Sequence, residues 1–540
     1  MMIATNLRRP KSEAYPSWYG WRQVGLGMVI LVVAALIPVF HGNTRLALYS
    51  VLGCMTVLCG IAFMDWRAGV LILIGILTVE DLIRKYLGNN MLIYFLKDSV
   101  YLAVLLSFLL TSMTQRRWGQ RRLTLHIPFL PFLAVFLAYA VVQTFNPNSP
   151  SPLYGVIGFR MNFLYLPLIW LGFHICQTPE DLGRFWTFCL LVASVVAVLG
   201  IIQGIVGLDF LNPPTLAEEI RPLAYLVREA PISGYRVPRP CSVFVSDGRF
   251  GHFMLLCLTL GLGACIALWL HPVWREWLTG WRRIALVLGT ALCGVALFMV
   301  GSRGGFVFGI LTVLTMVVVS HWQATVQRLR RRFRKAFLNA VLAVGITFVM
   351  VRLAAPEALK ARWAFYWETL SPWSPRSELF ERVFRYHPQN FWIAFSSPVA
   401  LFGQGFGTNS LGIQYLRKFT NVPPPQVVVE SGIGNIVAET GIIGLVLWLL
   451  WSFAAVWSAW KVVKQLRDSV FAPFAVSIGW YATVKILGTL WGGMAGFQEF
   501  IGNAFLWLLL GILFRLPYLT LSPASRVTNE RHVPTASFGR

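Results

Sequence analysis

An arginine between glycines is the first position in this chain where residue type and spacing indicate chemistry. Arg303 lies in Gly301-Ser-Arg-Gly-Gly-Phe306, a short connection between two apolar stretches. If both stretches cross a membrane, Arg303 lies at or just inside the interface, where a cation is costly unless it is paired or functional. A guanidinium binds phosphate oxygens in a bidentate manner, and Gly304 and Gly305 would let a head group approach the backbone. The sequence therefore predicts either a phosphate-binding arginine or one that merely extends to the interface.

A second group of arginines lies in the long polar segment 355–438, which is predicted to carry short helices near 356–370 and 377–385. Arg382 and Arg385 are three residues apart and would share one helix face. Arg376 precedes them, and Glu381 is placed for an ordinary surface ion pair with Arg385. The glycine-rich stretch 401–407 predicts a turn, and it is not a nucleotide-binding fingerprint because no strand precedes it.

A carboxylate stands where the polar segment returns to apolar sequence. Glu430 precedes this return by a few residues and could accept a proton from an incoming hydroxyl group as a general base. The alternative is a loop carboxylate paired with a nearby arginine such as Arg417. Glu439 is predicted at the start of the next apolar helix, where the helix dipole favours a negative charge.

Composition indicates the scaffold that must position these groups. The chain has 540 residues, of which 56% are hydrophobic and 13% are charged. A soluble protein cannot bury so much apolar surface, whereas apolar runs of roughly 17–22 residues match a bilayer. We therefore predict an all-α polytopic membrane protein with about fourteen transmembrane helices and a large outer loop. The predicted helices are 24–40, 46–64, 68–83, 95–113, 127–145, 161–177, 184–207, 251–270, 282–300, 303–319, 337–354, 439–460, 470–491 and 499–516.

Short basic segments predict the orientation. Threading these helices through a membrane places the segments at 116–122, 282–283, 328–335 and 461–467 on one side, together with the tails 1–23 and 517–540. By the positive-inside rule this side is cytoplasmic. The segments 80–96, 146–160, 208–250 and 355–438 then face outward, and the mixed charges of the first of them could simply satisfy each other.

The net charge of +24 exceeds what anchoring requires, because several arginines fall on the outer side, among them Arg160 and Arg239. This excess predicts an anionic ligand such as a phosphate. Nucleic acid is excluded as a partner because these charges are dispersed over several loops.

The signals that are missing narrow the chemistry further. The sequence has no Walker A motif, no metal-ligand spacing and no disulfide framework among its eight cysteines, so no cofactor or metal is predicted. The energy for a reaction would then reside in a pre-activated substrate. Lys485 is an intramembrane cation whose partner could be Glu499. Lys485 is also the one feature that favours a transporter of lipid-linked sugar, although the sequence has no clear internal repeat.

These residues together resemble the O-antigen ligase and polymerase superfamily over roughly residues 240–460. The similarity lies in Ser302-Arg303-Gly304, in Pro398 to Gly407 and in Glu439-Thr-Gly441. Glu80 to Asp98 and Gly158-Phe-Arg160 resemble members that serve exopolysaccharide export. The resemblance implies a helical, GT-C-like membrane glycosyltransferase of the bacterial inner membrane. Such an enzyme transfers a glycan from undecaprenyl pyrophosphate to a sugar hydroxyl at the periplasmic face without metal, and its partners are membrane lipid and chain-length or export proteins.

The resemblance also assigns roles to residues. Arg303 matches the arginine of the Ser-Arg-Gly motif, and either Arg376 or Arg382 could match the arginine of the large loop. Ligases carry a histidine nine residues before the Glu-x-Gly motif, where this chain has Glu430, and this difference favours a polymerase over a ligase. The predicted catalytic residue is Glu430, and the predicted pyrophosphate-binding residues are Arg303, Arg376, Arg382, Arg385, Arg160 and Arg239.

Overall fold

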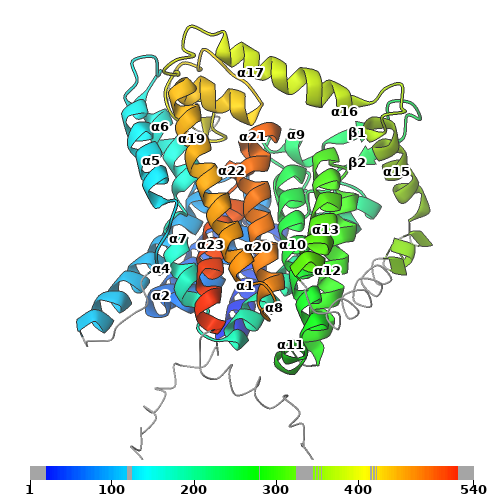
Figure 1. Cartoon of the computed structure of the whole chain (residues 1–540). Helices are drawn as coiled ribbons and strands as arrows, with labels where there is room; N and C mark the ends of the chain where they lie inside the picture. Colours follow the sequence, from blue (N-terminus) through cyan, green and yellow to red (C-terminus); the bar gives the residue numbers. More distant parts are fainter. Residues whose placement is uncertain are drawn as a thin grey trace, which may run out of the picture. The chain divides into compact units, whose positions relative to one another are not determined.

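The computed structural model describes residues 20–117, 125–278, 280–323, 345–346, 348–350, 352–353, 355–413, 416, 420 and 422–520. The chain forms two compact units, Met1–Gln120 and Arg121–Arg540. Helices dominate both units (Figure 1). The predicted basic segment 328–335, Arg417 and most of the predicted helix 337–354 lie outside the described residues.

The first unit contains four long helices. They are α1 (Gly20–Phe40), α2 (Thr44–Met64), α3 (Trp66–Tyr86) and α4 (Met91–Arg117). The side chains of Asn43 and Asp65 cap the amino ends of α2 and α3 by accepting backbone N–H bonds. The segment 80–96 was predicted as an outer loop, but it forms the ends of α3 and α4. Its charges are buried and paired: Lys97 lies 2.9 Å from Glu80, and Arg84 lies 3.0 Å from Asp81.

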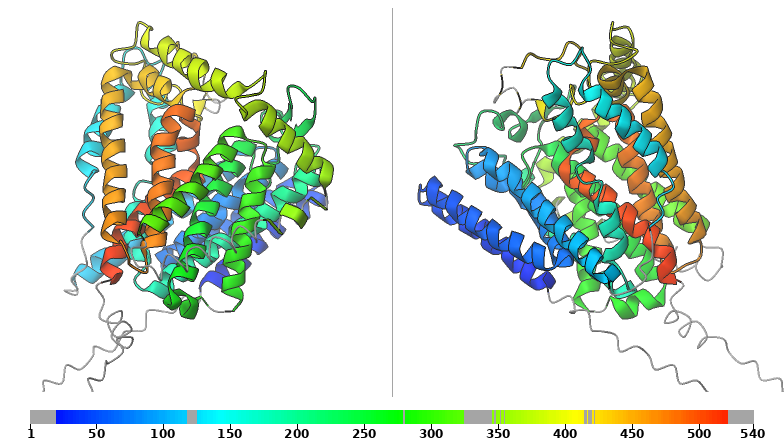
Figure 2. Two further views of the ribbon diagram at one scale, coloured as in Figure 1. Left: turned by 45° about the vertical axis from the view of Figure 1, so that its right-hand side comes forward. Right: turned by 90° about the vertical axis from the view of Figure 1, so that its left-hand side faces the viewer.

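The second unit is built from long apolar helices that pack side by side (Figure 2). They include α5 (Leu130–Thr144), α6 (Pro152–Phe163), α7 (Leu168–Ile175), α8 (Pro179–Val206), α10 (Asp247–Leu270), α12 (Trp281–Met299), α13 (Arg303–Gln323), α19 (Gly432–Gln465), α20 (Ala472–Thr483) and α23 (Phe500–Thr520). Helix α10 contacts α8, α12, α13 and α20, and α23 contacts α7. Because α10 and α23 are buried on nearly all sides, they form the core of this unit.

Within the described residues, nine helices are long and apolar enough to cross a membrane, and α1 and α5 are shorter apolar helices. The all-α, multi-pass membrane architecture predicted from the sequence is therefore supported, with fewer long helices than the predicted fourteen. The predicted helix 470–491 is broken into α20, a π-helix at Val484–Gly488 and α21 (Thr489–Gly492). Helices α1 and α23 extend about four residues into the predicted tails, to Gly20 and Thr520.

Short elements cover one end of the second unit (Figure 1). They are α9 (Arg221–Ala224), the strands β1 (Val227–Glu229) and β2 (Arg236–Pro238), α15 (Pro356–Leu370), α16 (Glu378–Phe380), a π-helix at Glu381–Tyr386 and α17 (His387–Phe395). The short helix α22 (Ala495–Gln498) is instead buried against α6, α10 and α23. The strands pair antiparallel with Arg228 opposite Val237. The predicted helix near 356–370 is confirmed as α15, whereas the hairpin was not predicted.

The opposite end of this unit gathers basic residues. Trp274 of α11 (Pro272–Trp277) donates to the carbonyl of Val470 at 2.7 Å, and Arg467 donates to the carbonyl of Trp322 at 3.4 Å. These contacts bring together the start of α12, the end of α13 and the end of α19. Arg282, Arg283, Lys461, Lys464 and Arg467 belong to these termini, so in the described part of this unit the basic segments lie at the end away from the hairpin.

Candidate functional site

Arg303 is the first residue of α13 and lies at the end of the second unit that carries the hairpin. Its side chain is only 16% exposed and forms an ion pair with Glu378 of α16. Its guanidinium also lies 5.7 Å from the centre of the Phe365 ring. The largely buried arginine is thus paired, and its partner is a half-exposed carboxylate from another element.

Helix α15 carries Phe365 and is fixed by a buried arginine that sequence reasoning missed. Arg362 is fully buried and donates to the backbone carbonyls of Gly204, Pro238, Met299 and Ala358 at 2.8–3.3 Å. Burial lowers the pKa of Arg362 to about 10. These bonds connect α15 to α8, β2 and the end of α12, so Arg362 positions the helix that forms one wall of the site.

The same helix holds the hairpin. The Glu368 carboxylate accepts hydrogen bonds from the backbone N–H groups of Ile232 and Ser233 at 2.7 and 3.1 Å, in the turn between β1 and β2. Within the hairpin, Arg236 pairs with Glu229 at 3.3 Å. The hairpin is too short to be stable by itself, and these contacts explain how it keeps its place beside Arg303.

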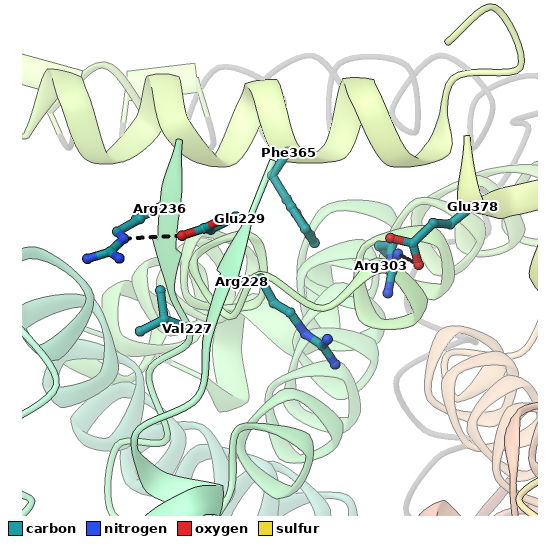
Figure 3. A pocket seen from close by; sticks show the side chains of 7 residues that line it. All are labelled: Val227, Arg228, Glu229, Arg236, Arg303, Phe365 and Glu378. Atoms are coloured by element: carbon teal, nitrogen blue, oxygen red, sulfur yellow. Dashed lines mark hydrogen bonds and ion pairs between the residues drawn. The ribbon is translucent and has the colours of Figure 1, made fainter. Parts of the chain in front are cut away.

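These elements enclose a polar pocket of about 540 Å³ (Figure 3). Figure 3 shows Arg228 directed from the hairpin toward Arg303, with Phe365 above and Glu378 beside Arg303. Within the described residues, Arg228 forms no hydrogen bond or ion pair, and it interacts electrostatically with Arg303 and Arg239. The residues that line the pocket are Val227, Arg228, Glu229, Arg236, Arg303, Phe365 and Glu378.

Two further arginines lie near the pocket. Arg382 lies 3.8 Å from the Glu378 carboxylate, so two guanidinium groups share this one carboxylate. Arg239 forms a largely buried ion pair with Asp247 at the start of α10. Burial lowers the pKa of Arg239 despite this pairing, and the positive charges of Arg228 and Arg303 act in the same direction. Repulsion among clustered arginines is what an anionic ligand would relieve.

The remaining predicted arginines do not line this pocket. Arg376 is exposed and donates to the carbonyl of Pro231 at 2.7 Å. Arg385 is exposed and lies 3.6 Å from Glu381, which is the surface ion pair considered from the sequence. Arg160 lies within α6 rather than in a loop, and its guanidinium lies 4.9 Å from the centre of the Phe500 ring.

Glu430 lies in an exposed position just before α19 and accepts a hydrogen bond from the Tyr386 hydroxyl. Its backbone N–H donates to the Asn390 side chain at 3.0 Å. The His387 ring is next to Tyr386, at 5.5 Å between ring centres, and lies 5.7 Å from Trp491 of α21. Partial burial lowers the pKa of His387, and Arg382 lowers it further, while Glu430 opposes the shift. His387 is therefore neutral near pH 7, and a neutral imidazole beside Glu430 could also accept a proton.

Arg382 connects the pocket to Glu430. Besides its contact with Glu378, its guanidinium lies 5.3 Å from the centre of the Tyr386 ring, and the Tyr386 hydroxyl bonds to Glu430. Arg382 and Tyr386 are both in the π-helix Glu381–Tyr386, a conformation that is rare and often marks functional sites. One continuous segment, from Glu378 to His387, thus joins the arginine-lined pocket to the predicted base.

Glu439 has a different role from the one predicted. It lies in the second turn of α19 rather than at its start, is buried, and accepts the backbone N–H bonds of Gly407 and Asn409 at 3.0 and 2.8 Å. Gly441 has a φ of 71°, where the helix bends and a side chain would overlap the carbonyl of Leu401. The glycine-rich turn was correctly predicted, and Glu439 fixes it against the bend.

Lys485 has the partner expected from the sequence. Its ammonium interacts electrostatically with Glu499, which forms an ion pair with His252 at 2.7 Å. Lys485 also donates to the carbonyl of Gly496. Lys485 and Glu499 are buried and His252 is half-exposed, and the three lie between α10, the broken segment 484–498 and α23, with the Glu499 carboxylate interacting with both other groups.

Four residues that the prediction of the site omitted are placed at it by the structure: Arg228, Glu378, Tyr386 and His387. Arg228 lies in the sequence Val-Arg-Glu, which could have indicated a short strand. The many prolines around it favoured an irregular segment instead. In the described part of the chain, no group of three or more His, Cys, Asp or Glu side chains could hold a metal ion. Comparison of the sequence with models of known protein families and with curated proteins found no match.

Proposed function

We propose that this protein is a membrane glycosyltransferase that joins lipid-pyrophosphate-linked oligosaccharides, a polysaccharide polymerase of the O-antigen polymerase type. The observation that carries the proposal is the pocket lined by Arg228, Arg303 and Glu378. Arg382 lies beside it, and Tyr386, four residues after Arg382, bonds to Glu430. A site that gathers guanidinium groups suits a pyrophosphate, and a neighbouring carboxylate suits deprotonation of an alcohol.

The proposed reaction is a single displacement at the anomeric carbon of the donor sugar. The bond from this carbon to the pyrophosphate oxygen breaks, and the bonding electrons leave with undecaprenyl pyrophosphate. Arg228, Arg303 and Arg382 stabilise the charge that grows on the leaving group. The acceptor hydroxyl oxygen forms the new glycosidic bond, and its proton passes to Glu430, with Tyr386 holding this carboxylate in place.

The distribution of charge supports an outer, periplasmic location for this reaction. The hairpin, α15 and α17 lie at one end of the second unit, and the described basic termini of α12 and α19 belong to the other end. By the positive-inside rule, the basic end faces the cytoplasm of the bacterial cell. A substrate that arrives already activated on its lipid carrier needs no nucleotide at the outer face.

A ligase that transfers the finished glycan to another lipid is the second candidate, because the arginine pocket would serve it equally well. Glu430 at the position of the ligase histidine favours the polymerase. A transporter is less favoured than the sequence suggested, since Lys485 interacts with the Glu499 carboxylate and donates to the carbonyl of Gly496 rather than being directed into a pathway.

The lipid-linked glycan that accumulates in a strain lacking this protein tests the proposal. Single repeat units on the carrier are expected for a polymerase, and full-length chains on the carrier would indicate a ligase. Accumulation on the cytoplasmic face alone would indicate a transporter. Re-expression of the parent chain must restore polymer, and an equally expressed Arg303→Ala variant must not.

A further inference from the structure

Glu378 is a carboxylate that Arg303 of the pocket and the neighbouring Arg382 share. Arg303 forms an ion pair with it, and Arg382 lies 3.8 Å from it. Arg228 also faces this pocket and has no carboxylate partner among the described residues. Arg236 and Glu229, which also line the pocket, neutralise each other. Arg228, Arg303 and Arg382 then stand against the one charge of Glu378, which leaves two positive charges in excess.

The position of the pocket creates a problem of selectivity. Arg303 begins a helix that is apolar enough to cross a membrane, and a bilayer crossed by this helix would have its lipid head groups at the level of the pocket. Phospholipid head groups are phosphodiesters, and each phosphate carries one negative charge. Arginines bind phosphodiesters readily, and a bare arginine site at this depth would be filled by the abundant membrane lipids instead of a scarce lipid-linked substrate.

We propose that Glu378 is a specificity-determining residue that makes the pocket selective for diphosphates over the singly charged phosphodiesters of membrane lipids. This inference rests on the proposed function, because it assigns the pocket to the pyrophosphate of the donor. Specificity commonly needs a repulsive element against the competing ligand, and a carboxylate inside an arginine site is such an element.

Charge explains the discrimination. A singly charged phosphate that binds Arg303 must displace Glu378, so one ion pair is exchanged for another. Little binding free energy is gained, because the displaced carboxylate also repels the phosphate. A diphosphate brings at least two charges, which match the two positive charges in excess. It can bind Arg303 and Arg228 while Glu378 stays near Arg382.

Local structure permits this exchange. Glu378 is 42% exposed and begins a helix of only three residues, and no side chain caps that helix. Arg382 follows one turn later, so the carboxylate can remain paired with it after leaving Arg303. The long helices need not move for the pocket to accept its ligand.

Binding of farnesyl pyrophosphate and of farnesyl methyl phosphate tests the proposal, because the two probes share one tail and the second is a phosphodiester with one negative charge, like a phospholipid head group. The parent protein in zwitterionic lipid nanodiscs should prefer the pyrophosphate. In Glu378→Gln, binding of the phosphodiester should tighten about tenfold or more and the preference should shrink, as expected for removal of a charge repulsion at close range. Phosphatidylglycerol added to the nanodiscs should compete with the pyrophosphate in this variant but not in the parent.

Glu381→Gln is the matched control, since Glu381 is exposed, lies three residues away and pairs only with Arg385 in the described structure. It should leave both affinities unchanged. Glu378→Asp keeps the charge and should keep the preference, which separates loss of charge from loss of local structure.

The outcomes separate this inference from the proposed function. If Arg303→Ala abolishes pyrophosphate binding while Glu378→Gln leaves the preference unchanged, the role of Glu378 is overturned and the donor site stands. If Arg303→Ala binds pyrophosphate like the parent, both the donor site and the inference are overturned.

Discussion

At the residue scale, the site depends on how two functions are divided among neighbouring side chains. Guanidinium groups from three separate elements, β1, α13 and the π-helix, would hold the leaving group, and one carboxylate would receive the proton. Arg303 and Arg382 could be predicted because their local sequence is distinctive. Arg228 could not, because its approach to Arg303 depends on a hairpin held by Glu368, which lies more than a hundred residues later in the chain.

The role of Arg303 can be tested by replacing its guanidinium group. Arg303→Lys keeps one positive charge but loses the two-pronged guanidinium, so we expect it to lose most of the activity. Arg303→Ala should reduce the rate by a factor of about 10² or more, the typical effect of removing a donor to a developing charge. Polymer formation in membranes with equal protein levels provides the measurement. Arg385→Ala is the control, because Arg385 is exposed and paired with Glu381. If Arg303→Ala forms as much polymer as this control, Arg303 does not bind the donor.

The role of Glu430 can be tested with a nearly isosteric change. Glu430→Gln keeps the shape and a hydrogen bond to Tyr386 but cannot take up a proton, so we expect the rate to fall by about 10²–10⁴-fold while donor binding is retained. Tyr386→Phe removes the hydroxyl that holds the carboxylate and should give a smaller loss. The measurement is polymerisation of lipid-linked repeat units by the purified protein. A rate for Glu430→Gln within about threefold of the parent would exclude general base catalysis by this residue.

At the element scale, short irregular segments position the site on a frame of regular helices. Helix α15 was predicted from its sequence, and so was the glycine-rich turn. The contacts that hold them were not predicted. Arg362 bonds to backbone carbonyls and Glu439 to backbone N–H groups, and every residue type has these groups, so the sequence does not indicate which of them are used. The break within the predicted helix 470–491 was missed for a related reason, since its apolar composition continues through the π-helix.

Arg362 is expected to be a structural residue rather than a catalytic one. Arg362→Met would fill much of the volume but leave the carbonyls of Gly204, Pro238 and Met299 without their buried donor. A buried carbonyl left without its donor costs about 1–3 kcal/mol, so we expect a lower midpoint of thermal unfolding in detergent. Faster proteolysis of the hairpin should accompany it. Lys360→Gln changes an exposed residue of the same helix and should leave the midpoint unchanged; an unchanged midpoint for Arg362→Met as well would show that α15 is held by other contacts.

At the scale of the whole molecule, the sequence sufficed for the class of fold but not for its details. Apolar runs define long helices because a bilayer demands that backbone polar groups bond within each segment. Helix α3 fits this rule poorly, since its last turns carry Glu80, Asp81, Arg84 and Lys85, and its charges are compensated by Asn89 and Lys97 near the start of the next helix. Such compensation depends on packing and cannot be read from composition.

The orientation of the second unit supports or overturns the whole proposal, and it can be measured from outside the cell. Cysteine introduced for Ile232, at the exposed turn of the hairpin, should react with a membrane-impermeant maleimide in intact cells whose outer membrane has been permeabilised. Cysteine introduced for Glu276, in α11 at the basic end, should react only after lysis. The native Cys54 and Cys59 are partly exposed and should first be replaced by serine, whereas the other six cysteines are buried. The reverse pattern would place the arginine pocket on the cytoplasmic side and the basic termini outside, against the positive-inside rule. A periplasmic polymerase would then be excluded.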